Sequence, residues 1–130
     1  MLNHKTICLA FGSVFVLVGL LGFIPNPIVS SEGIFETNDI HNFVHLFTGA
    51  AFLFGGMLVK EKAGLTLKAI TGAYFGVALL GFFTEGTMLL GMIHINEADR
   101  WLHLGLAMAM VVAAIGASQP STQLVAKSHA

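Results

Sequence analysis

The sequence predicts an all-α integral membrane protein, a four-helix bundle made of two repeated helical hairpins with the N and C termini in the cytoplasm. Two observations predict it. The 130 residues are 55% hydrophobic and only 10% charged, which is too little polar surface for an ordinary soluble domain. A motif in the first half also returns in the second half at a constant offset of 58 positions. We therefore expect one transmembrane domain, residues 1–130, with repeats at 6–60 and 65–117 and a flexible tail at 118–130.

Four apolar stretches have about the length that a helix needs to cross the roughly 30 Å of hydrocarbon in a bilayer. They are residues 6–24, 40–59, 65–83 and 98–117. In lipid, only a helix or a closed barrel satisfies its own backbone, and the sequence lacks the alternation of a barrel strand. The first stretch follows Lys5 as a signal peptide would. Its apolar core is longer than usual, however, and no Ala-x-Ala site follows, so we interpret it as an uncleaved span.

The first span ends before two prolines. Pro25 and Pro27 lack the amide hydrogen that continues a helix, and each restricts the residue before it. Within the span, Gly12, Gly19 and Gly22 predict the close approach of another helix, because small residues let two backbones come together. The connection to the second span is longer than a helical connection needs. We expect it to lie along the outer interface.

Capping residues define the starts of the second and fourth spans. Asn38 occupies an N-cap position with Asp39 in the first turn, and Asn96 precedes Glu97 and Asp99 in the same way. Asparagine satisfies free amides at a helix start, and acidic side chains are favoured at its positive dipole end. Both helices are therefore expected to begin at the outer surface.

Charge is distributed unevenly between the two sides that four spans create. Lysines flank the amino terminus, the middle turn and the carboxyl terminus, at Lys5, Lys60, Lys62, Lys68 and Lys127. Acidic residues dominate the other side, at Glu32, Glu36, Asp39, Glu85, Glu97 and Asp99. Because cytoplasmic loops carry an excess of Lys and Arg, both termini should lie inside and both motif copies outside. In a bacterium, this describes a multi-pass protein of the inner (cytoplasmic) membrane.

The repeated motif contains the candidate site. Its copies, His41-Asn-Phe-Val-His45-Leu and Asp99-Arg-Trp-Leu-His103-Leu, each place two ligand-type residues four positions apart. Residues at i and i+4 share one face of a helix. The repeat gives the two faces equivalent positions about an axis along the membrane normal. We therefore predict that His41 and His45 face Asp99 and His103 between the second and fourth spans.

Three imidazoles and one carboxylate are a donor set that suits Zn²⁺, Cu²⁺ or Fe²⁺. Glu36 and Glu85, at the outer ends of neighbouring segments, are candidates to complete or orient this set. The sequence therefore predicts an extracytoplasmic metal site. In such a site the imidazole nitrogens of His45 and His103 should lie within roughly 3–5 Å of each other.

Two other hypotheses fit the same residues. In one, the cluster is a structural polar plug with Asp99 as a capping residue, in an accessory subunit whose glycine-lined faces bind another membrane protein or a second copy of the chain. In the other, His45 and His103 hold a haem or face a quinone in an electron-transfer subunit. An enzyme acting on a soluble substrate is less well supported, because the sequence shows no nucleophile, phosphate loop or enclosing domain. No basic patch indicates nucleic acid, and His94 and Trp101 are expected at the membrane interface.

Four segments together resemble an uncharacterised bacterial family of small four-helix membrane proteins, known as a domain of unknown function. They are Val18-Gly-Leu-Leu-Gly-Phe-Ile-Pro25, Gly33-Ile-Phe-Glu-Thr-Asn38, His41-Asn-Phe-Val-His-Leu46 and Asn96-Glu-Ala-Asp-Arg-Trp-Leu-His-Leu104. The resemblance covers nearly the whole chain apart from the two tails. It implies the four-span fold but no activity. The family's recurrent residues correspond here to Asn38, His45, Asn96, Asp99 and His103.

Overall fold

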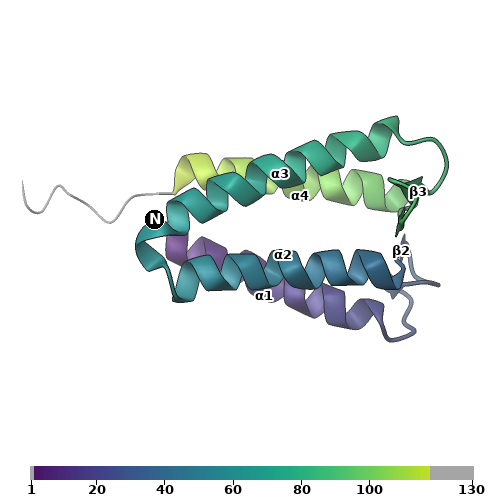
Figure 1. Cartoon of the computed structure of the whole chain (residues 1–130), viewed down its shortest axis with the longest axis horizontal. Coiled ribbons are helices and arrows are strands. Elements are labelled where there is room, and N and C mark those ends of the chain that lie inside the picture. The colour runs from purple at the N-terminus through teal and green to yellow at the C-terminus, as the bar shows by residue number, and fades with distance from the viewer. Residues whose placement is uncertain (1, 118–130) are drawn as a thin grey trace, which may run out of the picture.

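In the computed structural model, which describes residues 2–117, four long helices alternate in direction along the chain (Figure 1). They are α1 (His4–Gly22), α2 (Asp39–Met57), α3 (Ala63–Phe83) and α4 (Glu97–Gly116). A 3-10 helix, η1 (Lys60–Lys62), joins α2 to α3. The predicted mostly helical fold with four helices is therefore confirmed. The predicted flexible tail and Lys127 lie outside the described residues.

The helices begin and end close to the predicted positions. Asn38 and Asn96 are the N-caps of α2 and α4, as predicted, and each side chain accepts a backbone amide of its helix. α1 begins two residues earlier than predicted, because the side chain of Asn3 accepts the amide of Thr6 at 2.8 Å. It ends at Gly22, ahead of the two prolines.

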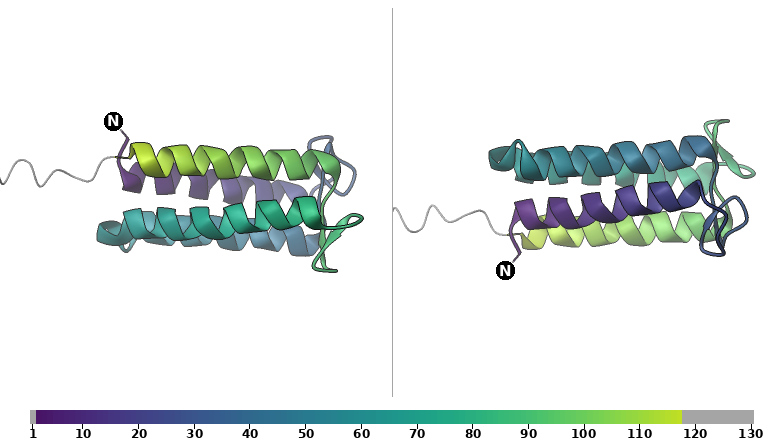
Figure 2. Two further views of the ribbon diagram at one scale, coloured as in Figure 1. Left: turned by 90° about the horizontal axis from the view of Figure 1, so that it is seen from above. Right: turned by 90° about the horizontal axis from the view of Figure 1, so that it is seen from below.

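Two turns of the chain containing short strands lie together at one end of the bundle (Figures 1 and 2). β1 (Val29–Ser30) pairs in parallel with β2 (Phe35–Glu36), and β3 (Met88–Leu89) pairs antiparallel with β4 (Ile93–His94). We call this the strand end. The amino terminus, η1 and the last turn of α4 lie at the opposite end, which we call the η1 end.

Glycines allow α1 to pack closely on α2. A Cβ atom at Gly12 would lie 3.0 Å from the carbonyl oxygen of Gly49, and one at Gly49 would lie 2.8 Å from that of Gly12. At Gly22, a Cβ atom would overlap the side chain of Asn42, which is 1% exposed. The close approach predicted from Gly12, Gly19 and Gly22 is therefore confirmed, and the approaching helix is α2.

The hydrophobic core joins the two hairpins. Phe15 of α1 contacts Tyr74 of α3 edge to face, with ring centroids 5.3 Å apart, and lies 6.1 Å from the ring of Phe52 on α2. Toward the η1 end, Cys8 is fully buried and its thiol donates to the carbonyl of Ala63 at 3.4 Å. The core thus holds the halves together along the middle and the η1 end, and most of the buried polar side chains lie toward the strand end.

Three helical segments are long and apolar enough to cross a membrane: His4–Gly22, Lys60–Phe83 and Glu97–Gly116. Within the described residues α2 is not among them, although it has 19 residues like α1. Its first two turns contain Asp39, His41, Asn42 and His45, which lower its hydropathy. Large apolar side chains cover the outside of the bundle, including Phe47, Phe83 and Ile115, which are 74%, 82% and 80% exposed. These features indicate a membrane protein.

The substitution Gly49→Ala should destabilise the protein, because the new Cβ atom would press on Gly12 and Val16 of α1. Overpacking of this kind costs about 1–3 kcal/mol. Replacing a glycine inside a helix returns only about 0.5–1 kcal/mol. Thermal unfolding in detergent, followed by circular dichroism, measures the effect.

Gly72→Ala in α3 is the matched control, because nothing lies within 4 Å of a Cβ atom at that position. It should leave the melting temperature unchanged or raise it. A melting temperature of Gly49→Ala at or above that of the wild type would contradict the close contact of α1 with α2.

Candidate functional site

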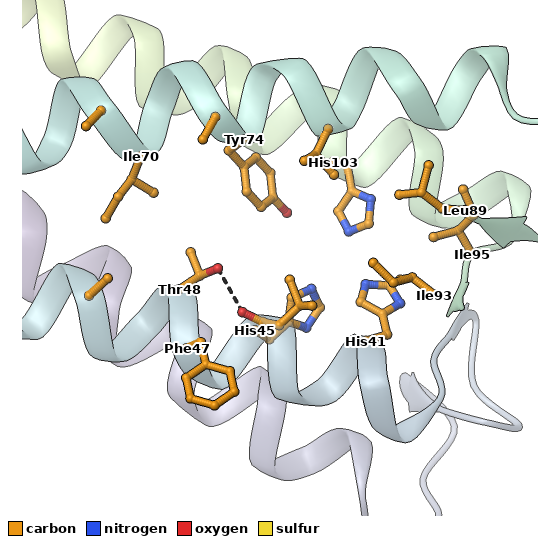
Figure 3. Close-up of a pocket in the computed structure, with 15 residues that line it drawn as sticks. His41, His45, Phe47, Thr48, Ile70, Tyr74, Leu89, Ile93, Ile95 and His103 are labelled. Atoms are coloured by element: carbon orange, nitrogen blue, oxygen red, sulfur yellow. Dashed lines mark hydrogen bonds between the residues drawn. The ribbon is translucent and has the colours of Figure 1, made fainter. Parts of the chain in front are cut away.

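Three histidines meet between α2 and α4 near the strand end (Figure 3). His41 and His45 lie one turn apart on α2 and share a face, and His103 points toward them from α4. The three residues are 2%, 6% and 8% exposed. One ring nitrogen of each lies within 4.8 Å of those of the other two. Two nitrogens bound to one ion at about 2.0–2.1 Å lie at most about 4.2 Å apart, so the rings would have to move slightly closer to share an ion.

The three rings are inclined to one another and do not stack in parallel. The ring centroids of His41 and His45 are 4.5 Å apart at an interplanar angle of 60°. The centroid of His103 lies 5.3 Å from that of His41 and 6.1 Å from that of His45. Figure 3 shows nitrogens of His41 and His103 facing each other across the space between the helices. The edges of the rings, where the nitrogens lie, therefore surround a common space.

The backbone of His94 orients the ring of His41. Nδ1 of His41 lies 2.7 Å from the carbonyl oxygen of His94. A carbonyl oxygen only accepts hydrogen bonds, so Nδ1 carries the hydrogen and Nε2 keeps its lone pair. Histidines that bind metals commonly donate their other N–H to a carbonyl or carboxylate in this way. His41 is thus arranged to act as a ligand through Nε2.

Glu36, predicted to complete or orient the donor set, reaches the cluster through His94. Its Oε2 lies 2.8 Å from Nε2 of His94, whose carbonyl accepts the hydrogen bond from His41. Glu36 is on β2 and His94 is on β4, so the pair links the two halves at the strand end. Glu85, the second predicted support, is exposed in the turn after α3.

Asp99, the fourth predicted ligand, makes the contacts of a capping residue. It is 1% exposed, and its carboxylate accepts the backbone N–H of Asn96 at 3.3 Å. The side chain of Asn96 in turn accepts the N–H of Asp99 at 3.0 Å. This capping box starts α4 one turn before His103. Among the described residues, the group with converging ligand atoms consists of the three histidines without Asp99.

The two turns at the strand end exchange equivalent hydrogen bonds. Asn38, the cap of α2, donates to the carbonyl of Met92 at 2.8 Å. Asn96, the cap of α4, donates to the carbonyl of Ile34, also at 2.8 Å. The two donors are 58 positions apart in the sequence, and so are the two acceptors. The residues that start the histidine-bearing helices thus also bind each half of the chain to the other.

Two buried polar atoms at the cluster have no hydrogen-bond partner in the described part of the chain: Nδ1 of His45 and the hydroxyl of Tyr74. Tyr74, on α3, is 8% exposed, and its ring lies edge to face with His103 at a centroid distance of 5.7 Å. Nearly all buried polar atoms in proteins have a partner. The two unpartnered atoms, Nδ1 of His45 and the hydroxyl of Tyr74, are therefore available to a further group at the cluster.

A cavity of about 440 Å³ opens beside these atoms, between α2 and α3 (Figure 3). Its α2 wall extends from His41 to Ala51 and its α3 wall from Ala69 to Val77. Its walls are apolar apart from the three histidines, Thr48 and Tyr74. The histidine cluster therefore borders a space large enough for part of a small molecule.

Two residues of this site, His94 and Tyr74, are not among the site residues predicted from the sequence. Both carry a signal in the repeat. Glu36 and His94 are 58 positions apart, and Phe15 and Tyr74 are 59 apart. In the predicted repeat, equivalent positions of the two copies would meet where a two-fold axis passes between them. A position-by-position comparison of the copies would therefore have paired His94 with Glu36 and Tyr74 with Phe15.

The sequence model of a domain of unknown function (DUF4383) matches residues 5–116. This range includes the histidine cluster, both capping asparagines and all four helices except the first residue of α1. No curated protein and no solved structure matches the chain.

Replacing Asn96 by Ala should destabilise the protein more than replacing Asn3 by Ala. Both variants lose an N-cap, which costs about 0.5–2 kcal/mol. Asn96 also loses its side-chain bond to the carbonyl of Ile34, which adds about 0.5–1.5 kcal/mol. Denaturant unfolding in mild detergent measures both free energies. Equal losses in the two variants would show that the exchanged bonds contribute nothing to stability.

Proposed function

Because this chain belongs to the family of the domain of unknown function DUF4383, its function must be inferred from its own residues, and we propose that it binds one divalent transition-metal ion in a membrane. The proposed ligands are His41, His45 and His103. The observation that carries the proposal is the convergence of their ring nitrogens within 4.8 Å at a buried position. Imidazole binds Zn²⁺, Cu²⁺ and Fe²⁺ well, and these are the proposed ions.

Small rotations of the side chains are enough to bring the three nitrogens onto one ion. Tetrahedral coordination with bonds of about 2.0–2.1 Å places ligand nitrogens about 3.3 Å apart. The nitrogens of the cluster are separated by no more than 4.8 Å. Three protein ligands leave a fourth position, and the cavity lined by the same histidines adjoins it. Zinc sites with three protein ligands typically hold a water molecule or a substrate in the fourth position.

The predicted carboxylates take supporting roles in this proposal. Asp99 starts the helix that carries His103, and Glu36 holds His94, whose carbonyl orients His41. Such partners of metal ligands fix the tautomer and direction of each imidazole. A bound ion would then be surrounded by ligands that are positioned from both halves of the chain.

The geometry favours a metal ion over a haem and over a structural plug. A haem held by His45 and His103 needs the space between their rings, but the ring of His41 lies only 4.5 Å and 5.3 Å from theirs. A structural plug leaves Nδ1 of His45 buried without a partner. Such an atom loses its hydration on burial without replacement. Metal coordination by this imidazole provides a reason for its burial.

For the membrane arrangement, we propose that all four helices span the inner membrane. α2 lies beside α1 and has the same length. The described lysines, Lys5, Lys60, Lys62 and Lys68, gather toward the η1 end, whereas the acidic side chains other than Glu61 gather at the strand end. The excess of Lys in cytoplasmic loops then places the η1 end inside and the histidine cluster on the extracytoplasmic side.

The contacts at the strand end support two copies of one hairpin, residues 6–60 and 65–117, about an axis along the membrane normal. Glu36 with His94 at the strand end and Phe15 with Tyr74 in the core join equivalent positions of the two copies, and the two asparagine bonds are equivalent to each other. The histidines His45 and His103 are also equivalent. An axis through these contacts passes beside the proposed metal.

Cysteine labelling tests the proposed orientation. In a Cys8→Ala background, Ser31→Cys should react with a membrane-impermeant thiol reagent in intact cells, and Lys62→Cys should react only after the membrane is opened. Both positions are exposed, so burial does not protect either of them. The reason for the expected difference is the excess of lysine at the η1 end. Labelling of position 62 alone in intact cells would reverse the orientation.

Metal analysis tests the site itself. Protein purified in detergent and equilibrated with Zn²⁺ should hold about one ion per chain. His103→Gln should lower the bound metal to background, because two imidazoles remain. His4→Gln is the matched control, since His4 is also buried, at 7% exposed, but lies beside Gly64 at the η1 end. It should retain the full metal content.

Acidification provides a second test of the same metal site. Protons compete with the metal for imidazole nitrogens, so acidification should release the metal. Wild-type protein that holds no metal after equilibration with Zn²⁺ would leave the structural plug as the better account.

A further inference from the structure

The cavity beside the histidines is an elongated groove that opens at the side of the bundle. Its α2 wall runs from His41 to Ala51, a length of about 15 Å at the helical rise of 1.5 Å per residue. Phe47 and Val77 border it and are 74% and 41% exposed. Leu89, Ile93 and Ile95 line it at the strand end. In the proposed membrane arrangement, the mouth between α2 and α3 therefore opens toward hydrocarbon.

The inner part of the groove presents a hydroxyl that has no partner. The hydroxyl of Tyr74 is buried, and Figure 3 shows it pointing from α3 into the space between the helices, toward His45 and His103. A phenolic hydroxyl donates one hydrogen bond. The lining contains no other side chain within reach that accepts it. This donor is therefore available to a molecule that enters the groove.

The lining also limits the charge of such a molecule. Within the described residues, no Lys, Arg, Asp or Glu lines the groove. A carboxylate or phosphate group would be buried there without a cationic side chain, which is unfavourable. A neutral molecule with an oxygen acceptor fits the donor, and an apolar tail fits the remaining walls. The inclined rings of Tyr74 and His103 offer edges against which a flat ring packs well.

We propose that this groove binds, from the bilayer, a neutral lipid-soluble molecule of the quinone class, with a ring carbonyl that accepts the hydrogen bond of Tyr74. The tail of the molecule lies along the apolar walls between α2 and α3. The proposal rests on the membrane placement of the proposed function but does not require the metal. It concerns binding only and includes no electron transfer.

Binding of a benzoquinone with a ten-carbon tail tests the proposal on full-length protein in lipid nanodiscs, with and without added Zn²⁺. Tyr74→Phe removes only the hydroxyl and should weaken binding about three- to tenfold. Ala73→Leu fills the groove from α3, where Ala73 lines it at an exposed position, and should weaken binding more than tenfold. Gly72→Leu is the matched control, because a Cβ atom there meets nothing within 4 Å and Gly72 is outside the lining.

Each outcome decides between the possibilities. Equal affinity of wild type and Tyr74→Phe, equal loss in Gly72→Leu and Ala73→Leu, or equal binding of a saturated fatty acid would overturn the quinone assignment. Absence of quinone binding by a wild type that holds Zn²⁺ overturns this proposal alone. Quinone binding that follows the expected variant pattern in a protein without metal overturns only the metal site.

Discussion

The exchange of hydrogen bonds at the strand end is the interaction on which the geometry of the site depends. Asn38 and Asn96 each start a helix that carries ligand-type histidines, and each binds the turn of the opposite half. The histidines come from different hairpins, whose apolar core lies farther toward the η1 end. The relative position of His45 and His103 is therefore set by these two asparagines and by the pair of Glu36 with His94. The caps stabilise helices and at the same time define the site.

The burial of the three histidines limits the partners that their ring nitrogens can find. Three imidazoles that are at most 8% exposed, beside an apolar cavity, have few ways to satisfy their nitrogens. The protein supplies one partner, the carbonyl of His94 to Nδ1 of His41. Nδ1 of His45 receives none in the described chain. In the proposed site, coordination to one ion would satisfy several nitrogens together and would explain why polar groups are placed where an apolar core would be more stable.

Much of the fold follows from the sequence, because it depends on local properties of the chain. The lengths of the apolar stretches predict the helices, the asparagines predict two of their starts, and the spacing of His41 and His45 predicts a shared face. The role of Asp99 does not follow from spacing alone, because an N3 carboxylate always lies beside the cap amide and also faces inward. His94 and Tyr74 have partners from the other half of the chain. Such contacts need tertiary structure or a comparison of the repeats, which is why these roles are missing from the predicted site.

The proposed metal site requires that three histidines from two helices bind the same ion. X-ray absorption at the zinc edge of protein loaded with one equivalent of Zn²⁺ observes this directly. We expect three imidazole nitrogens at about 2.0–2.1 Å from the zinc, together with a fourth light ligand. The imidazole signal should be reduced in His103→Gln. A shell of oxygen ligands only, or a spectrum that His103→Gln leaves unchanged, would contradict it.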